Sequence, residues 1–368
     1  MNQNRTIFIH VGQHKTGSTS IQKALILNKK VLEDNNIYFF KTNPDGSEGN
    51  NSEEWIKPIR DINTNKWDKP KNNLDYGDVY KINNTKLLAS KAASLPGDVV
   101  LSAESLSLIN NYEKLKELRF CFNQYFNNII IIIYLRRQDS QIISHSQEEG
   151  KGGGSLNKFG FFLNPNTAIP IHSNHYIGYL DYFERLSKWG NVFEDKNIIV
   201  GTYEKENLYK NDLVLDFFAK IGIENIKTIS NRENESWGFE KRKLVYLMES
   251  IKLNKYMSDI VTENIENTGK MLPSRDEAKN FYSGYKKINQ SLNAKFRINH
   301  KKFLFNDDFT MYPKIKNDIW DENKANDAFT NIFDALDNIS PSQLIIMSFK
   351  LQALSIRMKI RNIKKVFK

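Results

Sequence analysis

The chain has almost no cysteine and no long apolar run. Of its 368 residues only Cys121 is a cysteine, so no disulfide can form within the chain. This favours a reducing compartment. No stretch approaches the roughly 18–20 apolar residues of a membrane-spanning helix, and the first residues, MNQNRT, lack the basic and then apolar pattern of a signal peptide. We therefore expect a cytoplasmic protein.

Positive charge is unevenly distributed along the chain. The formal net charge is +10, yet seven basic residues and no acidic residue fall within residues 339–368, which leaves only +3 for the rest. A nucleic-acid-binding protein usually spreads basic residues over one face of its fold, so we expect no nucleic-acid partner. Residues 342–368 mix apolar and basic side chains as an amphipathic helix does. Such a helix either packs on the domain or makes peripheral contact with an anionic membrane, here the inner membrane surface.

Short apolar runs that alternate with helical patterns set the predicted fold class. The run at 129–135 has no polar alternation, which is typical of a central strand covered on both faces in a parallel sheet. The alternation predicts a doubly wound α/β fold, with a mainly parallel sheet of P-loop nucleotide-binding type and helices on both faces. We expect this domain over residues 1–310 and a helical extension over 311–368. The predicted strands are 6–11, 36–40, 98–101, 129–135 and 197–203, and the predicted helices include 17–34, 139–149 and 213–221.

The first predicted strand leads into a glycine-bounded loop, Gly12-Gln-His-Lys-Thr-Gly-Ser-Thr19. Its spacing fits the phosphate-binding pattern G-x-x-x-x-G-K-[ST], except that Ser18 occupies the lysine position. Glycines let backbone N–H groups turn toward an anion, and the following helix adds a favourable field. An ATP-dependent enzyme would also need a carboxylate for Mg²⁺, whereas the strand 129–135 is followed by two arginines, Arg136 and Arg137.

The loop resembles the 5′-phosphosulfate loop of sulfotransferases that use 3′-phosphoadenosine 5′-phosphosulfate (PAPS), with carbohydrate sulfotransferases of bacterial type as the nearest kind. The resemblance implies that Lys15 contacts the bridging oxygen of the phosphosulfate. It also implies that the 5′-phosphate is held by Thr16, Gly17, Ser18 and Thr19.

The same family binds the 3′-phosphate with an arginine at the end of a central strand and a serine eight residues later. Arg136 and Ser144 have this spacing, and the planar guanidinium of arginine suits paired phosphate oxygens. Arg137 is a weaker candidate for the same role. A third resemblance is Tyr203, at the end of the strand 197–203, where family members place a tyrosine near the nucleotide.

Sulfuryl transfer to a hydroxyl or amine needs a base that takes the acceptor's proton. The resemblance implies Glu104, just after the strand 98–101, because one branch of the family places its base there. The sequence leaves three other candidates for the base open, namely Glu53, Glu54 and His145. No cluster of His, Cys, Asp and Glu shows the spacing of metal ligands, so we expect catalysis without a metal.

The acceptor is predicted only as a class. Residues 41–80 and 150–180 are polar or glycine-rich with interspersed aromatics, which suits a saccharide or glycoconjugate. Two other functions remain open at this point. One is a P-loop small-molecule kinase that uses ATP with Mg²⁺, and the other is a non-catalytic protein with a nucleotide-binding fold that contacts a membrane through its basic tail.

Overall fold

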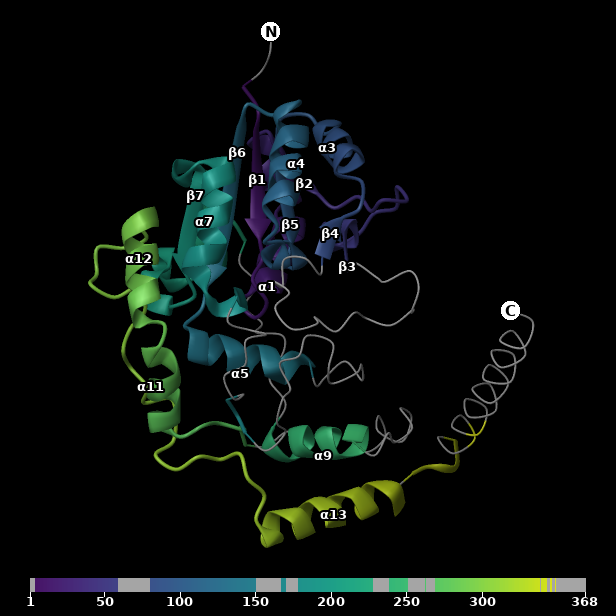
Figure 1. Ribbon diagram of the computed structural model, residues 1–368. Helices are drawn as coiled ribbons and strands as arrows, with labels where there is room; N and C mark the ends of the chain where they lie inside the picture. Colours follow the sequence, from purple (N-terminus) through teal and green to yellow (C-terminus); the bar gives the residue numbers. More distant parts are fainter. Residues whose placement is uncertain are drawn as a thin grey trace, which may run out of the picture.

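The computed structural model describes residues 4–58, 80–149, 167–169, 178–227, 238–250, 269–337 and 339–342, together with residues 262, 345 and 348. At its centre lies a five-stranded parallel sheet with the strand order β2-β5-β1-β6-β7 (Figure 1). The strands are β1 (Thr6–Val11), β2 (Ile37–Phe40), β5 (Asp98–Ala103), β6 (Asn128–Leu135) and β7 (Ile198–Thr202). The predicted parallel α/β sheet is therefore confirmed.

Helices cover both faces of the sheet, as the apolar run of β6 predicts. Ile131 and Ile133 of β6 pack toward one face, with α3 (Thr85–Ala93), α4 (Tyr112–Asn123) and α7 (Tyr182–Phe193). Ile132 and Tyr134 pack toward the other face, with α1 (Ser18–Leu27) and α8 (Leu213–Lys220). Because successive side chains of a strand point to opposite faces, a strand buried on both sides has no polar position.

Two local predictions differ from the structure. The single helix expected over 17–34 is divided at Asn28, which separates α1 from α2 (Lys29–Asp34), and the Asn28 side chain donates to the carbonyls of Ala24 and Lys227, both at 2.9 Å. The sequence predicts no strand between 41 and 97, but the structure has an antiparallel pair of three-residue strands there, β3 (Ile56–Pro58) and β4 (Tyr80–Ile82).

Further helices lie beyond the carboxyl ends of the strands, toward the bottom of Figure 1: α5 (Gln138–Glu149), α9 (Phe239–Ser250), α11 (Arg275–Ser283) and α13 (Glu322–Asp337). The helix α12 (Lys286–Phe296) instead lies beside the sheet, where it contacts α7 and β7. Short 3₁₀ segments complete the description: η1 (Glu53–Trp55), η3 (Ser105–Leu108), η5 (Asp195–Asn197), η6 (Lys205–Asn207) and η7 (Tyr209–Asn211). Within the described ranges no helix is both long and apolar enough to cross a bilayer. Most of the basic tail at 342–368 lies outside the described residues.

Candidate active site

The loop between β1 and α1 is tightly folded at the carboxyl edge of the sheet. The N–H of Gly12 donates to the carbonyl of Ala103 at 3.1 Å. A Cβ atom on Gly12 would lie 2.6 Å from Ser18 Oγ and 3.3 Å from the Cα of Glu104, so no side chain fits there. Lys15 and Gly17 both have positive φ angles, 63° and 82°. The chain therefore turns sharply enough to place several peptide groups around one point.

Neighbouring side chains hold the carbonyl groups of this loop. Gln141 Nε2 donates to the His14 carbonyl at 2.8 Å, and the Arg136 guanidinium donates to the Lys15 carbonyl at 3.2 Å. The first turn of α1 begins with Ser20 N–H donating to the Gly17 carbonyl at 3.0 Å. The N–H groups of residues 17–19 come before that bond in the chain, so they have no acceptor within the helix. An anion is favoured at this end of a helix.

Two hydroxyl groups of the loop have different roles. Thr16 Oγ1 donates to the Gln13 carbonyl at 2.7 Å, so it stabilises the loop itself. Ser18 is 1 % exposed, and its Oγ has no hydrogen-bond partner among the residues the structure describes. A buried hydroxyl without a partner carries a desolvation cost, and a bound phosphate oxygen would remove that cost. Ser18 thus fits the phosphate-binding role that the resemblance implies, whereas the Thr16 hydroxyl is already used.

Arg136 lies beside the loop at the end of β6. Its Nε donates to Ser140 Oγ at 2.7 Å, and its guanidinium carbon lies 5.6 Å from the centre of the Tyr203 ring. Burial lowers the pKa of Arg136, although an arginine stays charged at neutral pH. No carboxylate of the described residues lies within ion-pair distance of this guanidinium. Its charge is therefore available to an anion.

A cavity of about 170 Å³ joins Arg136 to Ser144, the two residues predicted to act together. Ser144 belongs to α5, about one turn after Ser140, and is 9 % exposed. Lys270 lines the same cavity from the segment before α11. Lys270 could not be predicted from the sequence, because it lies more than 120 residues from both partners and in no recognisable motif.

A second cavity, of about 260 Å³, is also lined by Arg136, and Tyr203 lines it too. Its lining residues are Arg136, Arg137, Ser140, Tyr203, Glu204, Glu206, Asn306, Asp308 and Met311. Arg136, Ser140 and Met311 line both cavities, so the two are neighbours. Tyr203 is thereby brought to the predicted nucleotide site.

Arg137 is bonded to other protein groups and has a structural role. Its guanidinium forms an ion pair with Asp139 at 2.8 Å and donates to the carbonyls of Asn306 and Asp308 at 3.0 and 2.7 Å. It also lies over the ring of Phe309, 4.0 Å from its centre. With these partners its donors are occupied, which argues against the weaker candidacy of Arg137 for phosphate binding.

The carboxylate implied as the base, Glu104, is bonded to a loop histidine. Glu104 Oε2 lies 3.0 Å from His14 Nδ1, and the two side chains are 29 % and 21 % exposed. Burial disfavours charge on both groups. Their hydrogen bond and mutual attraction outweigh it, so the pKa of His14 lies above its ordinary value and the pKa of Glu104 lies below. The pairing of these residues was not predicted, because 90 positions separate them.

The other three candidate bases have different surroundings. The Glu53 carboxylate accepts the N–H groups of Glu104, at 2.7 Å, and of Ser105, at 3.2 Å, so it stabilises the start of η3. Glu54 is exposed. His145 follows Ser144 on α5 and faces the loop, where its ring centre lies 4.8 Å from that of His14.

His145 is a buried neutral group. Its Nδ1 lies 3.1 Å from Tyr179 Oη, and the side chain is 3 % exposed. Burial, with the neighbouring charges of His14 and Lys15, holds the pKa of His145 well below its ordinary value. His10 is similar: burial lowers its pKa to about 4, and its Nδ1 lies 2.8 Å from Ser102 Oγ. Both histidines support the site rather than carry charge in it.

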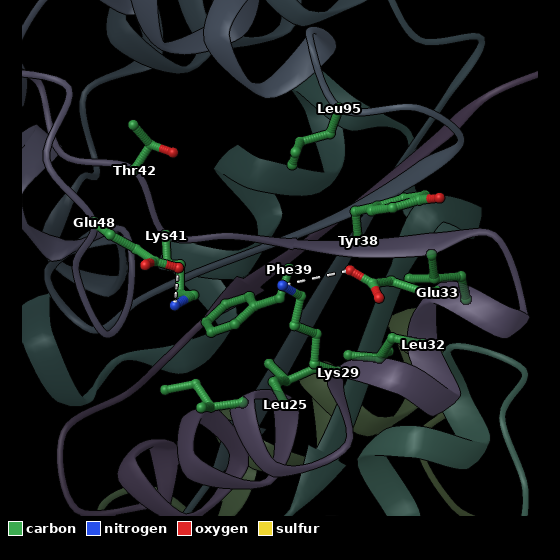
Figure 2. A pocket seen from close by; sticks show the side chains of 12 residues that line it. Leu25, Lys29, Leu32, Glu33, Tyr38, Phe39, Lys41, Thr42, Glu48 and Leu95 are labelled. Atoms are coloured by element: carbon green, nitrogen blue, oxygen red, sulfur yellow. Dashed lines mark ion pairs between the residues drawn. The ribbon is translucent and has the colours of Figure 1, made fainter.

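Figure 2 shows a separate hollow beside the edge strand β2, lined largely by apolar side chains such as Leu25, Leu32 and Phe39. Ion pairs join Lys29 to Glu33 and Lys41 to Glu48 at its rim. No loop residue from 12 to 17 is among its described lining residues. The hollow is therefore not part of the nucleotide site.

The described residues contain no group of three or more His, Cys, Asp or Glu side chains placed to hold a metal ion. The segments 41–80 and 150–180 are each described in part, and each contributes a residue beside Glu104 or His145. Glu53 from the first segment binds the backbone of Glu104, and Tyr179 from the second contacts His145. The remainder, 59–79, 150–166 and 170–177, lies outside the described residues.

Comparison with known proteins gives limited similarity. No family model matches the chain. An uncharacterized protein of Archaeoglobus fulgidus is 28 % identical over 130 residues, which cover 34 % of this chain and only 30 % of that protein.

Two solved structures overlap with larger parts of the chain. A sulfotransferase from Alicyclobacillus acidocaldarius has a TM-score of 0.39 and 15 % identity, over 79 % of this chain and 96 % of that one. The mouse sulfotransferase SULT7A1, crystallised with PAP, has a TM-score of 0.29 and 11 % identity, over 94 % and 89 %. TM-scores and identities this low assign no function to the chain. The function is therefore argued from the geometry of the loop and the cavities.

Proposed function

We propose that the protein transfers a sulfuryl group from PAPS to a hydroxyl or amine of an acceptor, which we take to be a saccharide or glycoconjugate. The position of Arg136 carries this proposal. Its guanidinium contacts the loop through the Lys15 carbonyl and shares a cavity with Ser144. Two anion sites therefore adjoin, and PAPS has two separate anionic groups, the 5′-phosphosulfate and the 3′-phosphate.

The loop residues fit the 5′ end of this cofactor. The N–H groups of residues 17–19 and the buried hydroxyl of Ser18 offer donors to a phosphate. When bound, PAPS supplies an activated sulfur atom whose leaving group is a phosphate. The role proposed for Lys15 is to neutralise the charge that develops on the leaving oxygen, an electrostatic effect that preorganised sites provide efficiently.

The residues of the Arg136 cavity fit the 3′-phosphate. A guanidinium can donate two parallel hydrogen bonds to phosphate oxygens, and such charge-assisted bonds are about twice as strong as neutral ones. The Ser144 hydroxyl and the Lys270 ammonium line the same cavity. Tyr203, over which Arg136 lies, borders the neighbouring cavity and is proposed to contact the nucleotide there.

A P-loop kinase is less well supported by the same residues. It would place a carboxylate near the loop to hold Mg²⁺. The carboxylate at the end of β5, Glu104, is instead bonded to His14. The strand β6 is followed by two arginines, of which Arg136 carries a charge without a carboxylate partner among the described residues.

Calorimetric titration separates these functions. The wild-type protein is titrated with 3′,5′-adenosine bisphosphate (PAP) in EDTA and, in parallel, with ATP and Mg²⁺. We expect PAP to bind with a dissociation constant on the order of micromolar, equivalent to about −8 kcal/mol, and ATP to bind much more weakly. Tight binding of ATP with Mg²⁺ and none of PAP would identify a kinase instead. Binding of neither nucleotide would favour a non-catalytic protein.

A further inference from the structure

Glu104 is held rigidly beside the loop. Its N–H donates to the Glu53 carboxylate at 2.7 Å, and its carbonyl accepts the Ser107 hydroxyl at 2.8 Å. Its N–H lies at the start of η3, but its own side chain makes no capping bond there. The carboxylate is directed to His14 instead, 3.0 Å from Nδ1. A carboxylate in this arrangement fixes both the orientation and the tautomer of an imidazole.

His14 is held in place by contacts of its carbonyl group and of its ring with α5. Its carbonyl accepts a hydrogen bond from Gln141 at 2.8 Å, and its ring packs at 39° against the ring of His145. It directly precedes Lys15, the residue proposed to act on the leaving group. The charged and titratable groups around its ring are Glu104, directly after β5, Glu53 of η1, Lys15 of the loop, and His145 of α5. His145 is in turn contacted by Tyr179.

We propose that His14 is the general base of the transfer and that Glu104 is the positioning residue that orients it. This inference rests on the proposed function and assigns the base within the same site. Because Nδ1 faces Glu104, the inference assigns the proton to Nε2, which is buried in the protein without nucleotide. The arrangement matches the general logic of a base held by a third group.

The step balances as an in-line displacement. The acceptor oxygen forms a bond to sulfur while its proton moves to His14 Nε2. The bond between sulfur and the bridging oxygen breaks, and its electron pair stays with the 5′-phosphate, next to Lys15. The Glu104 carboxylate stabilises the imidazolium that forms, without taking the proton itself.

The competing assignment, Glu104 as the base, predicts a different pH dependence. A base must be unprotonated, so activity rises with pH through its pKa. The pKa of Glu104 is held below its ordinary value of 4.5, whereas the pKa of His14 is raised above 6.5. The pH dependence of kcat/KM reports the groups of the free enzyme. A rise in kcat/KM above pH 6.5 therefore indicates His14, and a rise confined to the region below pH 4.5 indicates Glu104.

The first test needs no turnover. The ring protons of His14 are titrated by NMR in the protein without nucleotide, and His14→Asn identifies the signal. We expect the apparent pKa of His14 to lie above 6.5 and to fall in Glu104→Gln, because the neutral amide removes the attraction that favours the imidazolium. Glu113→Gln, which removes an exposed carboxylate of α4, serves as the charge-matched control and should leave the pKa of His14 unchanged.

The second test compares kinetics with binding. We expect His14→Asn to lower kcat by about 100-fold or more and to leave the affinity for PAP unchanged. In Glu104→Gln the rise of kcat/KM should move to lower pH together with the NMR pKa. Near wild-type kcat in His14→Asn, or a rise of kcat/KM that stays in place in Glu104→Gln, would overturn the inference. If PAP fails to bind the wild-type protein, the proposed function itself fails.

Discussion

Gly17 and Gly222 have the same backbone conformation, with φ of 82° at each, but their surroundings differ. A Cβ atom on Gly17 would lie 2.3 Å from Leu213 Cδ2 and 3.3 Å from Tyr203 Cε2. A Cβ atom on Gly222 would meet nothing within 4 Å. Both positions favour glycine because of the positive φ. Only Gly17 also needs glycine for lack of space beside the loop.

The variants Gly17→Ala and Gly222→Ala test this difference. Both place a side chain at a positive φ, which costs about 1–2 kcal/mol, so the Tm of both should fall. Only Gly17→Ala pushes on Leu213 and Tyr203, and we expect it alone to weaken PAP binding, by at least about tenfold or 1.4 kcal/mol. Thermal unfolding and calorimetry measure the two effects. An equal loss of PAP affinity in both variants would show that the loop does not depend on this close packing.

At the level of single residues, spacing within one segment predicts that Arg136 and Ser144 lie near each other, whereas their role in phosphate binding stays a prediction. Arg136 and Ser144 line one cavity because a strand end and the second turn of the next helix have a fixed relation. The contact of His14 with Glu104 could not be predicted in this way, since it depends on how β1 and β5 lie in the sheet. The same holds for Lys270, which reaches the cavity from a distant segment.

At the level of elements, apolar runs long enough to show a pattern predicted the sheet. The strand β6 has eight residues, and β1 and β5 have six each. Their side chains are mostly buried, so each strand shows a distinct apolar run in the sequence. The three-residue strands β3 and β4 are too short to show an alternation and were missed. The division of the first helix at Asn28 also escaped prediction, because it involves the distant carbonyl of Lys227.

The helix α5 shows why a polar pattern alone does not reveal a site. Four of its polar residues face three different neighbours. Gln141 binds the loop carbonyl of His14, while His145 packs on the ring of the same residue. Ser140 bonds to Arg136, and Ser144 lines the cavity. From the sequence this helix has no single apolar stripe, and each assignment requires the positions of the surrounding elements.

At the level of the whole molecule, the segment that follows the predicted domain end at 310 is joined to the body. Tyr312 is 1 % exposed and donates its hydroxyl to Asp139 Oδ2 at 2.7 Å. The backbone of Asn317 exchanges hydrogen bonds with that of Leu272 at 2.9 and 3.1 Å. Asp139 also forms an ion pair with Arg137, which follows β6. One buried carboxylate therefore binds both this segment and the residue after β6.

Two truncations examine the division expected between 1–310 and 311–368, which stays a prediction. A chain that ends at 310 lacks Tyr312 and leaves the buried Asp139 with fewer donors. We expect its free energy of unfolding to be lower than that of a chain ending at 337 by about 3 kcal/mol, the usual loss when a large buried aromatic is removed. Denaturant unfolding measures the difference. Equal stability of the two chains would mean that 1–310 is independent of the extension.

The most direct measurement of the central claim is a thermodynamic cycle on the 3′-phosphate. PAP and 5′-AMP differ by this group, and each is titrated into the wild type, Arg136→Ala and Arg119→Ala. Arg119 pairs with Glu194 outside the described lining of both cavities and serves as the matched control. We predict that Arg136→Ala weakens PAP by about 10- to 100-fold, or roughly 1.5–3 kcal/mol, with little change for AMP or in the control. Equal weakening of PAP and AMP in Arg136→Ala would contradict a 3′-phosphate site at this arginine.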